Sequence, residues 1–427
     1  MKYILFFLAV VSCSLRLSAQ SPYPLVKIDE GDEFRGPEEP SIAISRKDTS
    51  IVVAGANIKK VYASQNGGRS WEKQQLESQY GVWGDPCVVA APNGRFYFFH
   101  LSDPTGKNWA SDEILDRIVC QQSNKKGTKW SKGSYAGLNG AKDQDKEWAV
   151  IDPNTGTIYV TWTQFDKYDS KKPEDKSNIL FSKSTNKGRS WSTPVRINEF
   201  SGDCLDDDKT VEGAVPAVGP NGELYVAWSY DEKIYFDYSL DDGETWQEKD
   251  IVISVQPGGW NQNIPGINRT NGMPVTICDL SEGLNKGTVY VNWTDQRKGT
   301  NNTDVWVAKS TDGGKSWSQP IRVNDDETET HQFLTWMTVD QTTGNLYAVF
   351  YDRRAYVDAQ TDVYLATSTD GGETWVNEKI SAQPFRPVSS VFFGDYNNID
   401  AYQGMVRPVW TEYRDGKLSI WTAIIQK

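Results

Sequence analysis

The chain has 427 residues and contains 17 Trp, 20 Tyr and 35 Gly but only 4 Met and 2 His. This composition is typical of many short strands joined by tight turns, and it argues against a helix bundle. The formal net charge of −12 argues against a nucleic-acid partner, because binding to phosphates requires a positive surface.

The N-terminus reads as a signal peptide. Lys2 precedes an apolar run from Tyr3 to Leu15, and Leu17-Ser18-Ala19 provides small residues before a cleavage point. We therefore expect residues 1–19 to be removed and the protein to be secreted, periplasmic or extracellular. The run is too short for a stable membrane span, and no other segment approaches membrane length. The alternative is a lipobox at residues 10–13, which would leave a lipid anchor on Cys13.

An eight-residue segment recurs six times along the chain. It begins with Ser, carries Asp or Asn at its third position and Gly at its fifth, and ends with Trp. The second copy is decayed and keeps only the Ser, the Gly and the Trp. In chain order the copies are Ser64–Trp71, Ser123–Trp130, Ser184–Trp191, Ser239–Trp246, Ser310–Trp317 and Ser368–Trp375.

These residue types have a physical role in a turn. The side chain of Asp or Asn hydrogen-bonds its own turn, Gly provides a positive φ, and Trp packs the turn onto a sheet. The segment therefore predicts a hairpin turn and not a reaction centre. It resembles the Asp box, or BNR repeat, of the sialidase-type propellers, and the resemblance covers nearly the whole chain after the signal peptide.

Strand signals accompany each copy, and they are clearest in the fourth repeat. There the expected strands are Gly213–Val218, Gly222–Trp228, Lys233–Ser239 and the segment after Trp246. The pattern of the second strand also appears at Thr157–Trp162, Gly287–Trp293 and Gly344–Tyr351. Four strands per repeat form one blade of a β-propeller.

The last repeat has three strand signals, around residues 396–399, 405–410 and 418–425, and no box. The segment Tyr23–Asp29 resembles the fourth strands of other repeats, so we expect it to complete this blade and remove an exposed edge. We therefore predict an all-β, seven-bladed propeller as a single domain over residues 20–427, closed by its N-terminal strand. The six-bladed ring that is usual in sialidases is the alternative.

Candidate functional residues follow from this architecture. In propellers of this type, the segments before inner strands and the loops after second strands converge on one face around the channel. Before inner strands the sequence has Arg35, Glu38, Glu39, Asp85, Asp145, Lys146, Glu147, Glu212, His331, Asp395 and Tyr396. After second strands it has His100, Tyr168, Arg297, Arg354 and Arg414.

The resemblance to sialidases implies roles for some of these residues. That family holds a substrate carboxylate with an arginine cluster, because each guanidinium fits a carboxylate with two hydrogen bonds. It also uses a Tyr nucleophile assisted by a Glu, and an Asp as acid and base. The implied assignments are Arg35, Arg297 and Arg354 as carboxylate ligands, Glu212 with Tyr396 as the nucleophile pair, and Asp85 as a substitute for the acid and base. From their place before inner strands, Asp145 and Asp395 are expected to contact the substrate, with bracing between blades as the alternative for residues 145–148.

The sequence also departs from that family. Phe34-Arg35-Gly36-Pro37 resembles the family's Phe-Arg-Ile-Pro motif, but Gly36 replaces the Ile. The loop at residues 57–60 carries no acid where the family has its catalytic Asp. In addition, Arg297, Arg354 and Arg414 each follow an acid by two residues, so a repeated structural salt bridge is the alternative explanation for them.

No metal or cofactor is expected. The run Asp206-Asp207-Asp208 resembles a calcium-binding loop but lacks spaced ligands, which favours a solvated acidic turn. The four cysteines after the signal peptide match no zinc motif or disulfide scaffold, so we expect buried single thiols. They are Cys87, Cys120, Cys204 and Cys278.

Three functions are compatible with these residues. The leading hypothesis is a secreted, monomeric glycoside hydrolase of sialidase-like type that acts on an acidic or polysaccharide-derived glycan. The second is a seven-bladed polysaccharide lyase, in which His100 or His331 with a Tyr removes the proton next to a uronate carboxylate. The third is a propeller that binds a glycan or a protein without catalysis.

Overall fold

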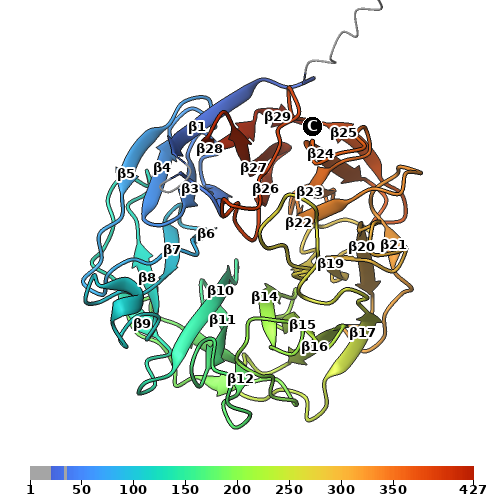
Figure 1. The fold of residues 1–427 in the computed structure, drawn as a ribbon. Coiled ribbons are helices and arrows are strands. Elements are labelled where there is room, and N and C mark those ends of the chain that lie inside the picture. The colour runs from blue at the N-terminus through green and yellow to red at the C-terminus, as the bar shows by residue number, and fades with distance from the viewer. Residues whose placement is uncertain (1–20, 33–35) are drawn as a thin grey trace, which may run out of the picture.

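Seven antiparallel sheets stand around a central channel as the blades of a propeller (Figure 1). The computed structural model describes residues 21–32 and 36–427, and their only helix is the short 3-10 helix η1 (Asn108–Ala110). The all-β, seven-bladed prediction is therefore confirmed, and the six-bladed alternative is wrong.

Each blade runs from an inner strand at the channel to an outer strand at the rim. Blade 1 consists of β2 (Ser41–Ile44), β3 (Val52–Ala56), β4 (Lys60–Ser64) and β5 (Glu72–Gln75). Blade 2 consists of β6 (Cys87–Ala90), β7 (Phe96–Leu101), β8 (Ile118–Gln122) and β9 (Ser134–Ala136). Blade 3 consists of β10 (Asp143–Ile151), β11 (Ile158–Phe165), β12 (Ser177–Ser184) and β13 (Val195–Arg196). Blade 4 consists of β14 (Glu212–Val218), β15 (Leu224–Tyr230), β16 (Lys233–Ser239) and β17 (Ile251–Val255). Blade 5 consists of β18 (Val275–Cys278), β19 (Val289–Asp295), β20 (Asp304–Ser310) and β21 (Ile321–Arg322). Blade 6 consists of β22 (Gln332–Val339), β23 (Leu346–Asp352), β24 (Asp362–Ser368) and β25 (Val376–Lys379).

Blade 7 joins the two ends of the chain. It contains β26 (Asn398–Tyr402), β27 (Met405–Arg414), β28 (Lys417–Ala423), the short β29 (Ile425–Gln426) beside β27, and the N-terminal strand β1 (Leu25–Asp32). β1 pairs with β28 in register from Leu25 opposite Ala423 to Asp32 opposite Lys417. Figure 1 shows this blue strand lying against the red strands of the C-terminus. The predicted closure of the ring is confirmed.

The repeated eight-residue segments fold as turns that dock one blade onto the preceding one. In Ser310–Trp317, the Ser310 hydroxyl accepts the N–H of Gly314 at 2.9 Å, and Asp312 Oδ1 accepts the N–H four residues later at 2.9 Å. The Trp317 ring lies 4.8 Å from the ring of Phe236 in the preceding blade. Gly314 has a φ of +87°, and a Cβ there would come within 2.3 Å of Phe236, so the position requires glycine.

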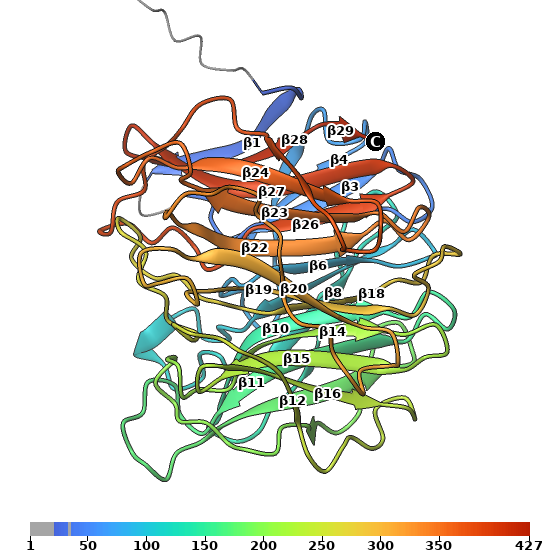
Figure 2. The same ribbon diagram turned by 90° about the vertical axis from the view of Figure 1, so that its right-hand side faces the viewer.

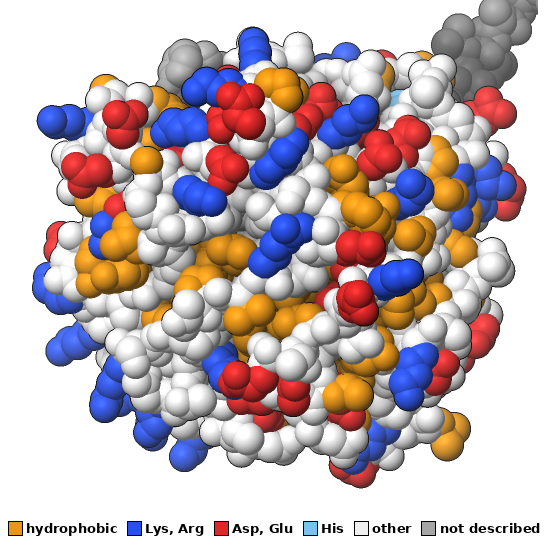
Figure 3. Space-filling model, turned by 90° about the horizontal axis from the view of Figure 1, so that it is seen from below, with side chains coloured by type: hydrophobic (Ala, Val, Ile, Leu, Met, Phe, Trp, Pro, Cys, Tyr) orange, Lys and Arg blue, Asp and Glu red, His pale blue; other side chains and the backbone are white. Residues whose placement is uncertain are grey.

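Blades pack face to face, so their middle strands are covered on both sides. All residues of β7 and β11 are buried, whereas the outer strands β5 and β13 are mostly exposed. The strands run from one face of the disc to the other (Figure 2). The rim that Figure 3 shows carries side chains of both charges, with hydrophobic side chains between them.

Two further features concern the described residues as a whole. No helix in residues 21–32 or 36–427 has the length and apolarity to span a bilayer. The four cysteines of this part of the chain are buried, and none forms a disulfide. The predicted signal peptide, Cys13 and Arg35 lie outside the described residues.

Candidate functional site

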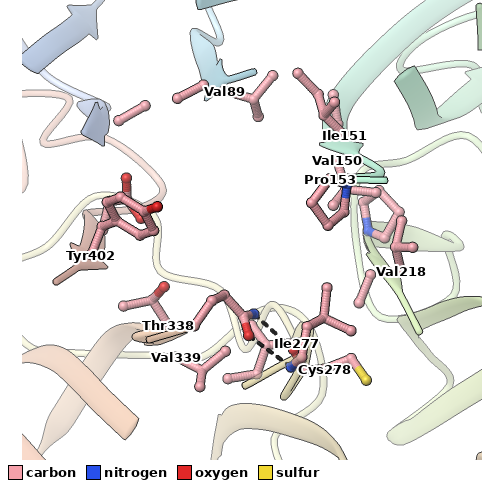
Figure 4. A pocket seen from close by; sticks show the side chains of 18 of the residues that line it. Val89, Val150, Ile151, Pro153, Val218, Ile277, Cys278, Thr338, Val339 and Tyr402 are labelled. Atoms are coloured by element: carbon pink, nitrogen blue, oxygen red, sulfur yellow. Dashed lines mark hydrogen bonds between the residues drawn. The ribbon is translucent and has the colours of Figure 1, made fainter. Parts of the chain in front are cut away.

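Two pockets lie at opposite ends of the channel. The first, here called the channel pocket, has a volume of about 630 Å³ and lies between the inner strands, including all of β6 and β18 and the later residues of β10, β14 and β22. Val89, Ile151, Val218, Val339 and Tyr402 surround its open centre (Figure 4). At the middle of the channel, the rings of Trp148 and Trp336 lie 4.3 Å apart.

The second pocket, here called the acidic pocket, lies where the inner strands of blades 1 to 3 begin. Its volume is about 420 Å³, which is within the range of small-molecule sites. Its lining consists of Glu38, Glu39, Asn57, Ile58, Trp83, Asp85, Leu101, Trp109, Leu115, Asp145, Lys146, Tyr168, Asn268, Arg269 and Phe392. Acidic, basic and aromatic groups therefore converge here, as expected for the face where inner strands start.

The backbone at the starts of these strands places the charged side chains. Glu39, Asp85 and Lys146 precede or begin the inner strands of blades 1, 2 and 3, and their φ angles are +52°, +51° and +53°. Such left-handed backbone is uncommon for residues other than glycine, and it is often found at functional sites. In β10 the pairing register also shifts between Asp145 and Trp148. In three neighbouring blades, a residue with left-handed backbone thus directs a charged side chain to the same place.

Asp395 lies beneath the acidic pocket and links its two cations. Lys146 Nζ is 2.8 Å from Asp395 Oδ2 and 3.2 Å from Asp85 Oδ2. Arg269 Nε donates to Asp395 Oδ1 at 2.9 Å, and the other end of its guanidinium lies 2.6 Å from Asp206 Oδ2. Each cation is therefore held between two carboxylates.

The carboxyl groups of this cluster have different pKa values because their surroundings differ. Burial alone would raise the pKa of Asp395, but Arg269 and Lys146 hold it well below its usual range. Burial, together with the charges of Asp85 and Asp206, raises the pKa of Asp145 to about 7 even though Lys146 opposes the shift. Burial also raises the pKa of Glu38 to about 8.

Glu39 lies deeper and is held by neighbouring residues. The backbone N–H of Asp395 donates to Glu39 Oε1 at 3.0 Å, and the Asn57 side-chain amide donates to Glu39 Oε2. Burial and the charge of Asp85 raise the pKa of Glu39 well above its usual range. Burial thus favours the protonated form of Glu39, and Asp145, with a pKa of about 7, titrates near neutral pH.

Glu212 and Tyr396, the predicted nucleophile pair, are buried beside this cluster and line neither pocket. The carboxylate oxygens of Glu212 and the Tyr396 hydroxyl have no hydrogen-bond partner among the described residues. Burial and the charges of Asp206 and Asp145 raise the pKa of Glu212. Burial and the charges of Asp85 and Glu39 raise that of Tyr396. Their main charged neighbours thus differ.

The two histidines are enclosed by protein. His100 Nδ1 lies 2.7 Å from the Leu101 carbonyl oxygen, and Nε2 lies 3.1 Å from Gln121 Oε1. His331 Nδ1 lies 3.0 Å from the Thr303 hydroxyl. Burial lowers the pKa of each histidine to about 4, and neither lines one of the two pockets.

Arg297, Arg354 and Arg414 each bind the acid two residues before them. The Nε–carboxylate distances are 2.9 Å from Arg297 to Asp295, 2.8 Å from Arg354 to Asp352 and 2.8 Å from Arg414 to Glu412. Arg297 also stacks on Trp306 and Arg354 on Tyr364, both at 4.3 Å. The repeated salt bridge is therefore present in three blades, and none of these arginines lines the acidic pocket.

The structure thus unites part of the predicted set. Asp85 and Asp145 line the acidic pocket, and Asp395 lies beneath it. Arg269 and Trp109 also line it, although sequence reasoning did not select them. Both lie in long connections between strands, at residues 256–274 and 102–117. The length of these connections was the only signal in the sequence.

The described residues contain no group of three or more His, Cys, Asp or Glu side chains arranged to hold a metal ion. The Asp206–Asp208 run is engaged by protein groups instead. Asp206 binds Arg269 and accepts the Tyr168 hydroxyl at 2.7 Å, and Asp208 accepts the N–H of Asn261 at 2.8 Å.

Comparison with known proteins places the fold. No protein-family model matches the chain. An ulvan lyase of polysaccharide lyase family PL25 superposes with a TM-score of 0.56 at 12% identity, covering 96% of each chain. The NanB sialidase of Streptococcus pneumoniae gives 0.53 at 10% identity, covering 88% of this chain and 83% of the sialidase. A protein of unknown function from Dyadobacter fermentans gives 0.53 at 11% identity, covering 94% and 99%. At these identities the likeness shows the propeller fold alone.

Proposed function

We propose that the protein is an exported, carbohydrate-active propeller, and that its acidic pocket hydrolyses glycosidic bonds. The observation that carries this proposal is the pair Asp145 and Asp85 in one pocket with aromatic side chains. Asp145 titrates near neutral pH, whereas Asp85 lies 3.2 Å from the Lys146 ammonium. Glycoside hydrolysis needs two carboxyl groups whose environments give them different roles.

In this mechanism Asp145 is the general acid. It donates its proton to the glycosidic oxygen as the bond to the leaving group breaks. Asp85 provides the negative charge that stabilises the positive charge developing on the sugar ring. A water molecule then adds to the anomeric carbon and gives its proton to the Asp145 carboxylate, which restores the acid. Because Asp145 must be protonated to act and its pKa is about 7, the rate should fall as pH rises through neutrality.

A sialidase-type hydrolase is the narrower form of this proposal, and the repeat turns and propeller fold support it. It would need guanidinium groups that are available to a substrate carboxylate. Arg297 and Arg354 bind acids of their own blades, and Arg269 is the one described arginine that lines the acidic pocket. Arg269 itself binds Asp395 and Asp206, so turnover of a sialoside is the result that would favour this narrower form.

The test measures hydrolysis of a panel of fluorogenic glycosides by the wild-type protein and by Asp145→Asn. We expect kcat to fall by at least about 100-fold, since the general acid is lost, while KM changes little. Asp250→Asn is the matched control, because Asp250 has a pKa raised to about 6 by burial but lies on blade 4, away from the pocket. Its kcat should equal that of the wild type.

Two other outcomes would contradict hydrolysis. An unsaturated, ultraviolet-absorbing product would identify a lyase. Retention of glycans on an array without turnover of any substrate would identify a binding protein.

A further inference from the structure

The two cations of the acidic pocket are saturated by protein carboxylates. Lys146 has only 4% of its side chain exposed and lies between Asp85 and Asp395. Arg269 binds Asp395 with Nε and Asp206 with a terminal nitrogen, and it lies over the Phe392 ring at 5.5 Å. Among the described residues that line the pocket there is no other Lys or Arg.

Apart from Tyr168, the remaining ionisable side chains of the lining are acids. Glu38, Glu39 and Asp145 face the same space as Asp85. Three carboxylates, of Asp85, Asp395 and Asp206, share the two cations, so a carboxylate on a bound sugar would find no free guanidinium and would add to an excess of carboxylates. Like-charge repulsion would therefore oppose its binding. A protonated amine would meet carboxylates instead, and the low solvent content of a pocket strengthens that attraction.

An aromatic wall forms one side of the same pocket. Trp109 is 58% exposed, and its ring stacks on Tyr168 at 5.6 Å and meets the edge of Trp83 at 6.0 Å. Such a large exposed ring held by two others offers a rigid apolar face, which suits the C–H face of a sugar ring. Aromatic faces also attract a neighbouring ammonium group.

We propose that the acidic pocket selects sugars without an acidic group, that it prefers a protonated amino sugar to its uncharged analogue, and that Trp109 stacks on the sugar ring. This inference rests on the proposed carbohydrate activity and narrows its substrate class.

The test uses oligosaccharides that differ only in charge. Binding of β-1,4-linked tetramers of glucosamine, glucose and glucuronate is measured by calorimetry, together with galacto-configured counterparts. We expect the amino sugar to bind at least ten-fold more tightly than the uronate, with the uncharged sugar between them, and the difference to shrink as salt increases. A uronate that binds as tightly as the amino sugar overturns the inference but leaves the proposed function standing. Failure of every sugar to bind contradicts the proposed function itself.

Variants locate the effect in this pocket. Asp206→Asn releases one end of Arg269, so it should strengthen uronate binding several-fold and weaken amino-sugar binding. Trp109→Ala should weaken binding of all three sugars by about ten-fold or more, because it removes the stacking surface without a change in charge. Leu284→Ala is the control, since Leu284 is fully exposed outside the pocket. If Asp206→Asn melts like the wild type but leaves the ranking of the sugars unchanged, the saturated arginine does not set the selectivity.

Discussion

At the scale of single residues, burial and charge partners decide what each carboxyl group can do. Asp395 and Asp145 are both buried and both lie near Lys146. Asp395 contacts two cations and stays ionised, whereas Asp145 is also close to Asp85 and Asp206 and keeps its proton to about pH 7. The difference in pKa follows from the ion pairs that Asp395 forms with Lys146 and Arg269. Asp145 accepts a hydrogen bond from the backbone N–H of Lys146 and not from its ammonium group.

Asp237, on β16, permits a test of the same physics away from the pocket. Burial, helped by the charge of Asp250, raises its pKa to about 8, against about 4 in an unfolded chain. The folded protein therefore binds more protons between these values, so its stability should fall as pH rises from about 4 to 8. Asp237→Asn removes the titrating group and should reduce the loss of melting temperature across this window by several degrees.

The matched control for this experiment is Glu248→Gln, on the surface of the same blade. It should keep the wild-type dependence of melting temperature on pH. A wild-type dependence in Asp237→Asn would show that Asp237 does not titrate in this range.

At the scale of elements, β1 is the strand on which the ring depends. Ile28 is 2% exposed and packs with residues of blades 7 and 1, and Asp29 Oδ2 accepts the Tyr62 hydroxyl at 2.7 Å. Deletion of residues 20–30 should therefore lower the melting temperature by more than 10 °C or prevent folding, because it exposes the edge of β28.

A milder variant keeps this prediction testable if the deletion does not fold. Ile28→Ala should cost about 2–4 kcal/mol in the free energy of unfolding by denaturant. Glu30→Gln, at an exposed position of the same strand, should cost less than about 1 kcal/mol. An unchanged melting temperature in the deletion would refute the role of β1 in closing the ring.

The elements could be predicted because their signals are local. Box turns mark where the third strand of a blade ends, and alternating apolar residues mark the strands around them. The sequence defines the start of an inner strand less well. The inner strand of blade 7, β26, begins at Asn398, two residues after the expected Tyr396. Asp85 and Asp145 could be selected because they directly precede or begin inner strands.

At the scale of the whole molecule, the ring brings distant residues together. The acidic pocket combines side chains from Glu38 to Phe392. The contribution of Arg269 could not be predicted, because its connection folds across the face and reaches Asp395, 126 residues further along the chain. The roles of Arg297 and Arg354 were equally open, since an acid two residues earlier permits either a structural pair or a free guanidinium.

The acidic pocket is the proposed reaction site. A crystal structure of Asp145→Asn with a bound glycan tests it most directly. We predict a sugar ring against Trp109, with its glycosidic oxygen within hydrogen-bonding distance of the side chain at position 145. A glycan bound in the channel pocket or on the rim, with the acidic pocket empty, would contradict the claim.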